Sequence, residues 1–193
     1  MENTQYCLCC NEEVPFNTVF RNERQETTCA FCGFTLDVQK LWEARKPSGK
    51  GYTLIADDSR YTRKIIEDLL REKSFSANLL SFENGLELIS SYSRLLKEKQ
   101  KIDIAIIDLN MPVMDGLTAA RTMRSLESQG MMKKTPIIFF SSEKADEGLK
   151  KQMELLKPAN YVNKGSDPDP DNLALRIEFL VTHLIDKYAQ ETT

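Results

Sequence analysis

Residues 102–116 read IDIAIIDLNMPVMDG, and this stretch decides the fold of the chain. Its first six residues are almost continuously apolar, which is typical of a central parallel strand covered on both faces. Similar runs occupy residues 52–56, 77–82, 137–141 and 160–163. Helical periodicity follows each run, at residues 61–72, 86–99, 116–128, 145–156 and about 171–188. The alternation predicts an α/β fold with a five-stranded, doubly wound parallel sheet.

The composition is that of an ordinary globular chain. Of the 193 residues, 41% are hydrophobic and 28% are charged, and the mean hydropathy is −0.42. The longest purely apolar runs span four residues, whereas a membrane helix needs about 20, so we expect no membrane insertion. The first residues, MENTQYCLCC, have no basic region typical of a secretory signal. We therefore expect a cytoplasmic protein.

Three parts follow from the pattern along the chain. Residues 1–36 contain all five cysteines and few helix-forming segments. Residues 37–50 begin like a short connector helix and end in a polar linker containing proline and glycine. Residues 51–190 carry the alternating strands and helices. We expect a small N-terminal domain, a connector and one α/β domain.

Polar side chains follow several of the expected strands. Asp57 and Asp58 follow the first, Asp108 closes the third, Ser141 closes the fourth, and Lys164 follows the fifth. Ligands of open α/β sheets bind at the carboxyl ends of the strands. Clustered carboxylates suit Mg²⁺, and a lysine with a hydroxyl suits an added phosphoryl group. A strand-end aspartate is also a common helix cap, so the agreement of several strand ends is the stronger indication.

Two blocks of sequence carry a resemblance to a known family. LIADDSR at residues 54–60 and IIDLNMPVMDG at 106–116 resemble the receiver domain of bacterial response regulators. The strand at 136–142 and YVNK at 161–164 also match. The resemblance covers about residues 51–190 and implies the flavodoxin-like receiver fold.

The resemblance implies a phosphoacceptor site. Asp108 matches the aspartate that takes a phosphoryl group from a sensor histidine kinase or a phosphotransfer protein. Asp57 and Asp58 match the acidic pair that holds Mg²⁺, with Asp108 and the backbone of Asn110 completing the metal site. A covalent aspartyl phosphate would then be stabilised by metal and ammonium charge.

The resemblance also implies switch residues. Ser141 matches the switch hydroxyl, Lys164 matches the lysine that pairs with the phosphoryl oxygens, and Tyr161 matches the aromatic that turns inward on activation. One departure is visible, because Gly165 follows Lys164 where many receivers have proline. We expect this difference to affect the geometry of the loop and not the chemistry.

Two further positions influence hydrolysis of the acyl phosphate in receivers, and here they hold Asn110 and Glu143. This pair is similar to that of chemotaxis-type receivers, which lose the phosphoryl group quickly. Polar side chains at these positions leave a path for an attacking water, so we expect a short-lived signal. Alternatively, neighbours such as Lys144 cover the site and slow hydrolysis.

The cysteines indicate a second metal. Cys7-x2-Cys10 and Cys29-x2-Cys32 are two CxxC pairs separated by 18 residues, which is typical of a four-cysteine zinc ribbon whose pairs are joined by a hairpin. A segment of 36 residues buries little apolar surface, so Zn²⁺ would supply most of its folding energy. Cys9 is left over, as a free thiol or as a competing ligand. An iron–sulfur or redox role is the alternative for the cluster.

Nucleic-acid binding by this segment is disfavoured by charge. Residues 1–36 hold two basic and five acidic residues, and four thiolates with one Zn²⁺ would add further negative charge. Phosphate contacts dominate nucleic-acid affinity, so protein binding is the better interpretation.

We therefore expect a response regulator that accepts a phosphoryl group on Asp108 and acts through a downstream protein target. Because the chain stops at Thr193, we expect no DNA-binding or catalytic output domain. We also expect no enzymatic activity beyond Mg²⁺-dependent self-phosphorylation and autodephosphorylation. His183, the only histidine, is not expected to be a phosphodonor. The alternative function is a zinc-ribbon, protein-binding adaptor whose receiver acts independently of phosphorylation.

Overall fold

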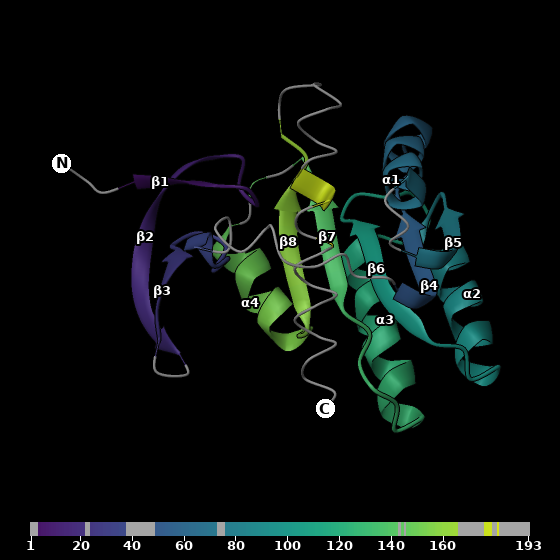
Figure 1. The fold of residues 1–193 in the computed structure, drawn as a ribbon. Coiled ribbons are helices and arrows are strands. Elements are labelled where there is room, and N and C mark those ends of the chain that lie inside the picture. Colours follow the sequence, from purple (N-terminus) through teal and green to yellow (C-terminus); the bar gives the residue numbers. More distant parts are fainter. Residues whose placement is uncertain are drawn as a thin grey trace.

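Two sheets make up the protein. The computed structural model describes residues 4–21, 24–37, 49–72, 76–142, 144, 146–165, 176–178 and 181. Within these residues, a three-stranded antiparallel sheet precedes a five-stranded parallel sheet that is flanked by helices (Figure 1). The expectations for the connector helix, for Glu143, for His183 and for most of the last helix lie outside the described residues.

The parallel sheet has the strand order β5-β4-β6-β7-β8. Its strands are β4 (Gly49–Ala56), β5 (Ser76–Phe82), β6 (Ile102–Asp108), β7 (Ile137–Ser141) and β8 (Ala159–Asn163). The helices between them are α1 (Arg60–Glu72), α2 (Gly85–Lys97), α3 (Gly116–Gln129) and α4 (Glu147–Leu155). The predicted five-stranded, doubly wound sheet is confirmed. Among the described helices, none is both long and apolar enough to cross a membrane.

Each face of the parallel sheet is covered by helices. Successive side chains of a strand point to opposite faces. Ile106 of β6 therefore packs in one core with Ile66 of α1. Its neighbour Ile107 packs in the other core with Leu88 of α2 and Met123 of α3. Burial on both faces explains the continuous apolar run of β6.

The first parallel strand begins earlier than expected, because β4 takes in two residues of the anticipated linker. Gly49 pairs with Ser76 of β5. The backbone N–H of Gly51 donates to Asp103 Oδ2 at 2.7 Å. A Cβ on Gly51 would lie 2.5 Å from the carbonyl oxygen of Lys101, so only glycine fits there. Partners that are distant in the sequence therefore extend this strand.

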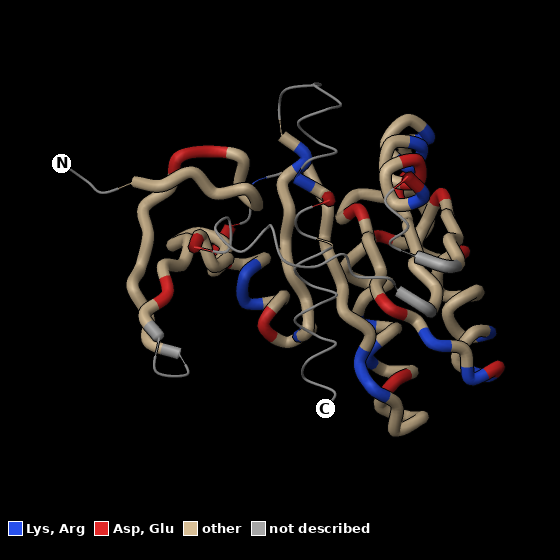
Figure 2. Tube along the Cα trace, in the orientation of Figure 1, with Lys and Arg blue, Asp and Glu red and all other residues tan. Residues whose placement is uncertain are grey.

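The N-terminal sheet has the order β1-β2-β3. It consists of β1 (Thr4–Cys7), β2 (Glu12–Arg21) and β3 (Arg24–Cys29). The expected hairpin between the two cysteine pairs is confirmed, with Val19 opposite Glu26 and Phe16 opposite Cys29. Acidic residues lie along this sheet (Figure 2), and its strands contain Glu12, Glu13 and Glu26.

The N-terminal sheet lies beyond the β8 edge of the parallel sheet and shares a core with it (Figure 1). Cys9 and Val14 are buried in the same apolar cluster as Val162 of β8 and Ile177. We propose that residues 1–36 and 51–190 are two domains and that residues 37–50 connect them. The shared core couples the first domain to the second.

Candidate functional site

Three carboxylates meet at the carboxyl edge of the parallel sheet. Asp57 and Asp58 follow β4, and Asp108 ends the neighbouring strand β6. One oxygen of each carboxylate lies within 4.8 Å of the others. Asp57 and Asp108 are buried, whereas Asp58 is exposed. The structure thus brings together the three carboxylates that the sequence analysis placed at this edge.

Lys164, which follows β8, reaches into this cluster. Its Nζ lies 2.7 Å from Asp108 Oδ2 and 2.8 Å from Asp57 Oδ2. Its backbone N–H donates to the carbonyl of Ser141 at 2.7 Å, which fixes the start of the loop. Burial favours the neutral amine, but hydrogen bonds and charge from Asp108 and Asp57 outweigh it and raise the pKa of Lys164. One ammonium group therefore serves two buried carboxylates.

Asp57 is the carboxylate that most needs a further cation. Burial raises the pKa of Asp57, although Lys164 opposes the shift. Its Oδ1 accepts from the backbone N–H of Ser59 at 2.9 Å. Its buried Oδ2 has only the ion pair with Lys164 and no donor in hydrogen-bond geometry within the described residues. Mg²⁺ prefers hard oxygen ligands, so this buried carboxylate oxygen and the two neighbouring carboxylates fit a magnesium site.

The loop after β6 is shaped around Asp108. The backbone N–H of Asn110 donates to Asp108 Oδ1 at 3.3 Å, and that of Gly116 donates to the carbonyl of Leu109 at 2.9 Å. A Cβ on Gly116 would lie 2.1 Å from the carbonyl oxygen of Asp108, so a larger residue would displace the loop. The glycine that ends the quoted motif thus lets α3 begin directly beside Asp108.

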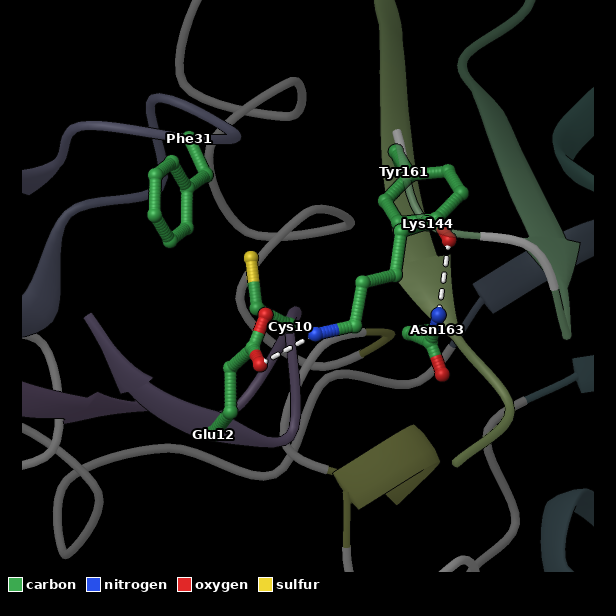
Figure 3. Close-up of a pocket in the computed structure, with 6 residues that line it drawn as sticks. All are labelled: Cys10, Glu12, Phe31, Lys144, Tyr161 and Asn163. Atoms are coloured by element: carbon green, nitrogen blue, oxygen red, sulfur yellow. Dashed lines mark hydrogen bonds and ion pairs between the residues drawn. The ribbon is translucent and has the colours of Figure 1, made fainter. Parts of the chain in front are cut away.

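Ser141 and Tyr161 are both buried next to this edge. Ser141 ends β7, the strand between Asp108 and Lys164. The Tyr161 hydroxyl accepts from Asn163 Nδ2 at 2.9 Å. Tyr161 and Asn163 also line a cavity of about 320 Å³ between β8 and the N-terminal sheet (Figure 3). The aromatic ring therefore has open space beside it.

Four of the five cysteines form one cluster. The sulfur atoms of Cys7, Cys10, Cys29 and Cys32 all lie within 4.8 Å of one another. The backbone N–H groups of Phe31 and Cys32 donate to Cys29 Sγ at 3.3 and 3.4 Å. Hydrogen bonds from Cys10 and Cys32 lower the pKa of Cys29 to about 7. Four convergent thiols supported by backbone amides suit a tetrahedral metal.

Cys9 lies outside this set of four, although it sits between two of its members. Its thiol is buried, and burial raises its pKa. Its backbone carbonyl accepts from the N–H of Asn163 at 2.7 Å. Cys9 therefore contacts β8 through its backbone, while its side chain fills the core that the two sheets share.

Arg63 supports the acidic pair, although no sequence motif indicates it as a functional residue. Arg63 of α1 is buried and donates from Nη1 to the carbonyl oxygens of Asp57 and Asp58, at 2.7 and 3.2 Å. It also pairs with Glu83 at 2.8 Å. An arginine on the apolar face of a helix, three residues before the buried Ile66, was the available signal.

The strand order and the acidic cluster at its switch point define the class of flavodoxin-like receiver proteins. The model of the family described as response regulator receiver domain matches residues 53–177, more than half of the chain. The chain belongs to this family.

Three similar proteins illustrate the likeness. A protein-glutamate methylesterase/protein-glutamine glutaminase of Methanosarcina mazei is 37% identical over 105 residues, which cover 54% of this chain and 26% of that protein. Chemotaxis protein CheY of Bacillus subtilis is 30% identical over 76 residues, which cover 39% of this chain and 58% of CheY. This chain thus spans about a quarter of the methylesterase.

The third similar protein is a solved structure, the receiver domain of the histidine kinase CKI1 from Arabidopsis thaliana complexed with Mg²⁺. It superposes with a TM-score of 0.55 at 22% identity, covering 62% of this chain and 86% of that one. At this identity the likeness shows the fold.

One expectation needs correction. The motifs predict a protein without enzymatic function beyond self-phosphorylation and autodephosphorylation, yet several of the curated relatives are named as methylesterases and glutaminases. The match to them covers only their receiver part, which is itself non-catalytic, so the local motifs could not reveal the enzymes in which such a receiver occurs. The expectation that proteins with such a receiver have no enzymatic function is therefore wrong.

Proposed function

We propose that this chain is a response regulator whose receiver accepts a phosphoryl group on Asp108 from a histidine kinase or a phosphotransfer protein. The observation that carries the proposal is the position of Lys164 Nζ, 2.7 Å from Asp108 Oδ2 within a cluster of three carboxylates. A phosphoryl group on Asp108 would find an ammonium partner already in reach.

Phosphoryl transfer to Asp108 forms one bond and breaks one bond. An oxygen of Asp108 attacks the phosphorus of a phosphohistidine, the donor P–N bond breaks as the O–P bond forms, and the donor imidazole leaves. Lys164 then exchanges its contact with Asp108 for one with a phosphoryl oxygen, and the Ser141 hydroxyl binds another. Asp57, Asp58, Asp108 and the Asn110 backbone would hold Mg²⁺, whose charge would neutralise that of the phosphoryl group.

The signal leaves the receiver through protein contacts. We infer that the regions around Tyr161 and the N-terminal sheet present the phosphorylation state to a downstream protein target. The acidic residues of the N-terminal sheet support a protein partner over a nucleic acid. A phosphorylation-independent adaptor is not favoured, because it would not require the buried acidic cluster with its paired lysine.

We further propose that Cys7, Cys10, Cys29 and Cys32 bind one Zn²⁺. The support is the approach of all four sulfur atoms to within 4.8 Å and the backbone amides directed at Cys29. Such a site is structural, since four protein ligands leave no open position for a substrate.

The test of phosphoacceptance is intact mass after incubation with a phosphorylated phosphotransfer protein and Mg²⁺. The wild type should gain one phosphoryl group, and Asp108→Asn should gain none. Asp103→Asn is the matched control, because Asp103 lies on the same strand but pairs with Lys101 and Gly51 at the far end. An unmodified wild type, or a labelled Asp108→Asn, would contradict the proposal.

A further inference from the structure

The first cysteine knuckle, residues 7–11, packs against the end of β8. The carbonyl oxygen of Cys9 accepts from the backbone N–H of Asn163 at 2.7 Å. Asn163 immediately precedes Lys164, and its side chain bonds to Tyr161 before the lysine and to Gly165 after it. Its Nδ2 donates to the Tyr161 hydroxyl at 2.9 Å, and its Oδ1 accepts from the N–H of Gly165 at 2.7 Å. One residue thus joins the knuckle, the aromatic and the lysine loop.

Arg176 reinforces the same junction. Its guanidinium donates to the carbonyl of Leu8 at 2.8 Å, to that of Cys9 at 3.4 Å and to that of Asn163 at 2.5 Å. Arg176 is only 1% exposed, so its charge is buried beside the cysteine cluster. Four thiolates around one Zn²⁺ carry a net charge of −2, which would offset this buried cation.

Gly165 allows the close contact between the knuckle and the loop that contains Lys164. Its φ of 85° lies in the left-handed region that favours glycine. A Cβ at this position would lie 2.8 Å from Asn11 Nδ2 of the knuckle, closer than real Cβ contacts. The replacement of the proline common in receivers by glycine therefore allows the knuckle to approach the lysine loop.

A cavity lies between the knuckle and the aromatic. Cys10, Glu12 and Phe31 line one side, and Tyr161 and Asn163 line the other (Figure 3). Lys144, which follows β7, crosses to Glu12 at 2.6 Å. The two parts therefore meet around the residues expected to move on phosphorylation.

We propose that the first knuckle positions the Lys164 loop, residues 163–165. Zinc binding at the four cysteines and phosphoryl binding at Asp108 then strengthen each other. This inference rests on the proposed function. Zinc fixes Cys7 and Cys10, which flank the two carbonyls that hold Arg176 and Asn163. The fixed knuckle holds Asn163 and Gly165, and thereby keeps Lys164 in the position from which it reaches Asp108.

The test is a competition for zinc between the full-length protein and a chromophoric chelator. One arm contains Mg²⁺ alone, and the other contains Mg²⁺ with beryllofluoride as the phosphoryl mimic. We expect beryllofluoride to tighten zinc binding by about fivefold or more, and zinc to tighten beryllofluoride binding by the same factor. Asp108→Asn should abolish the effect while retaining zinc.

Fluorine NMR of bound beryllofluoride and metal analysis separate the two levels of failure. If both ligands bind and the zinc affinity is the same in the two arms, the coupling is overturned and the proposed function stands. If beryllofluoride or zinc does not bind, the corresponding part of the proposed function fails, and the coupling fails with it.

Variants at the contact between Gly165 and Asn11 test whether the coupling passes through this contact. Gly165→Ala should weaken the coupling measurably, because its Cβ displaces the Asn11 side-chain amide. The double variant Asn11→Gly with Gly165→Ala should restore it, because the clashing amide is gone. The double variant also controls for backbone strain, since it keeps alanine at a φ of 85° and removes only the close contact. No loss in Gly165→Ala, or no recovery in the double variant, would overturn the role of Gly165.

Discussion

Lys164 Nζ lies 2.7 Å from Asp108 Oδ2, although Asp108 ends β6 and Lys164 follows β8, two strands that are separated in the sheet by β7. The same amine lies 2.8 Å from Asp57, so it bridges two carboxylates that are otherwise in mutual repulsion. This bridge links the stability of the receiver to its chemistry, because removing the amine leaves two buried negative charges.

Loss of the bridge should destabilise the protein. Lys164→Ala should lower the free energy of unfolding by about 3–5 kcal/mol in the absence of Mg²⁺, because a buried pair loses one partner. Urea denaturation measures the change. Lys150→Ala is the control, since Lys150 pairs with the exposed Glu147 and its loss should cost much less. A Lys164→Ala variant as stable as the control would show that solvent already screens the carboxylates.

The raised pKa of Asp57 predicts a pH dependence. In the window between the unfolded pKa of about 3.9 and the raised folded pKa, the folded state holds the proton more tightly. The free energy of unfolding should therefore fall as the pH rises through this window in metal-free protein. Asp57→Asn should remove this decline. Urea titrations across the pH range test it, and an identical decline in the variant would assign it to another group.

Magnesium should reverse the effect of that buried charge. Because a cation favours the ionised carboxylate, Mg²⁺ should stabilise the wild type at neutral pH, increasingly with concentration. Asp57→Asn should lose most of this stabilisation, whereas Glu147→Gln, an exposed carboxylate on α4, should keep it. Thermal unfolding with and without Mg²⁺ measures the difference. Equal stabilisation of all three proteins would place the metal elsewhere.

The cysteine cluster predicts a metal content. Purified protein should contain about one zinc per chain, and Cys29→Ala should lose it, whereas Cys9→Ala should retain it because Cys9 lies outside the four. Chelation should unfold the N-terminal segment, since metal ligation supplies its folding energy. It should also lower the stability of the receiver, because the two share a core. Iron and visible absorbance in place of zinc would contradict the assignment.

The loop after β6 predicts the lifetime of the phosphoryl group. Asn110→Arg should lengthen it severalfold, because the longer side chain obstructs the path of the attacking water. Val113→Arg adds the same side chain at an exposed position of the same loop and should leave the lifetime unchanged. Glu143→Leu extends the test to the second position. Decay of the phosphorylated mass measures all three, and an unchanged Asn110→Arg lifetime would show that water access is not limiting there.

The sequence by itself determined the parallel sheet, the carboxyl edge where Asp57, Asp58 and Asp108 meet, and the pairing of CxxC motifs. These features are local or periodic: apolar runs report burial, and strand ends of parallel neighbours meet at one edge. The tertiary structure alone decided that Arg63 supports the acidic pair, that Arg176 joins two sheets, and that Gly165 receives the knuckle. The contacts of Arg176 and Gly165 depend on which distant segments come together, whereas that of Arg63, six residues after Asp57, depends on the path of the chain between β4 and α1. A charged or small residue has no periodic pattern that indicates its partner.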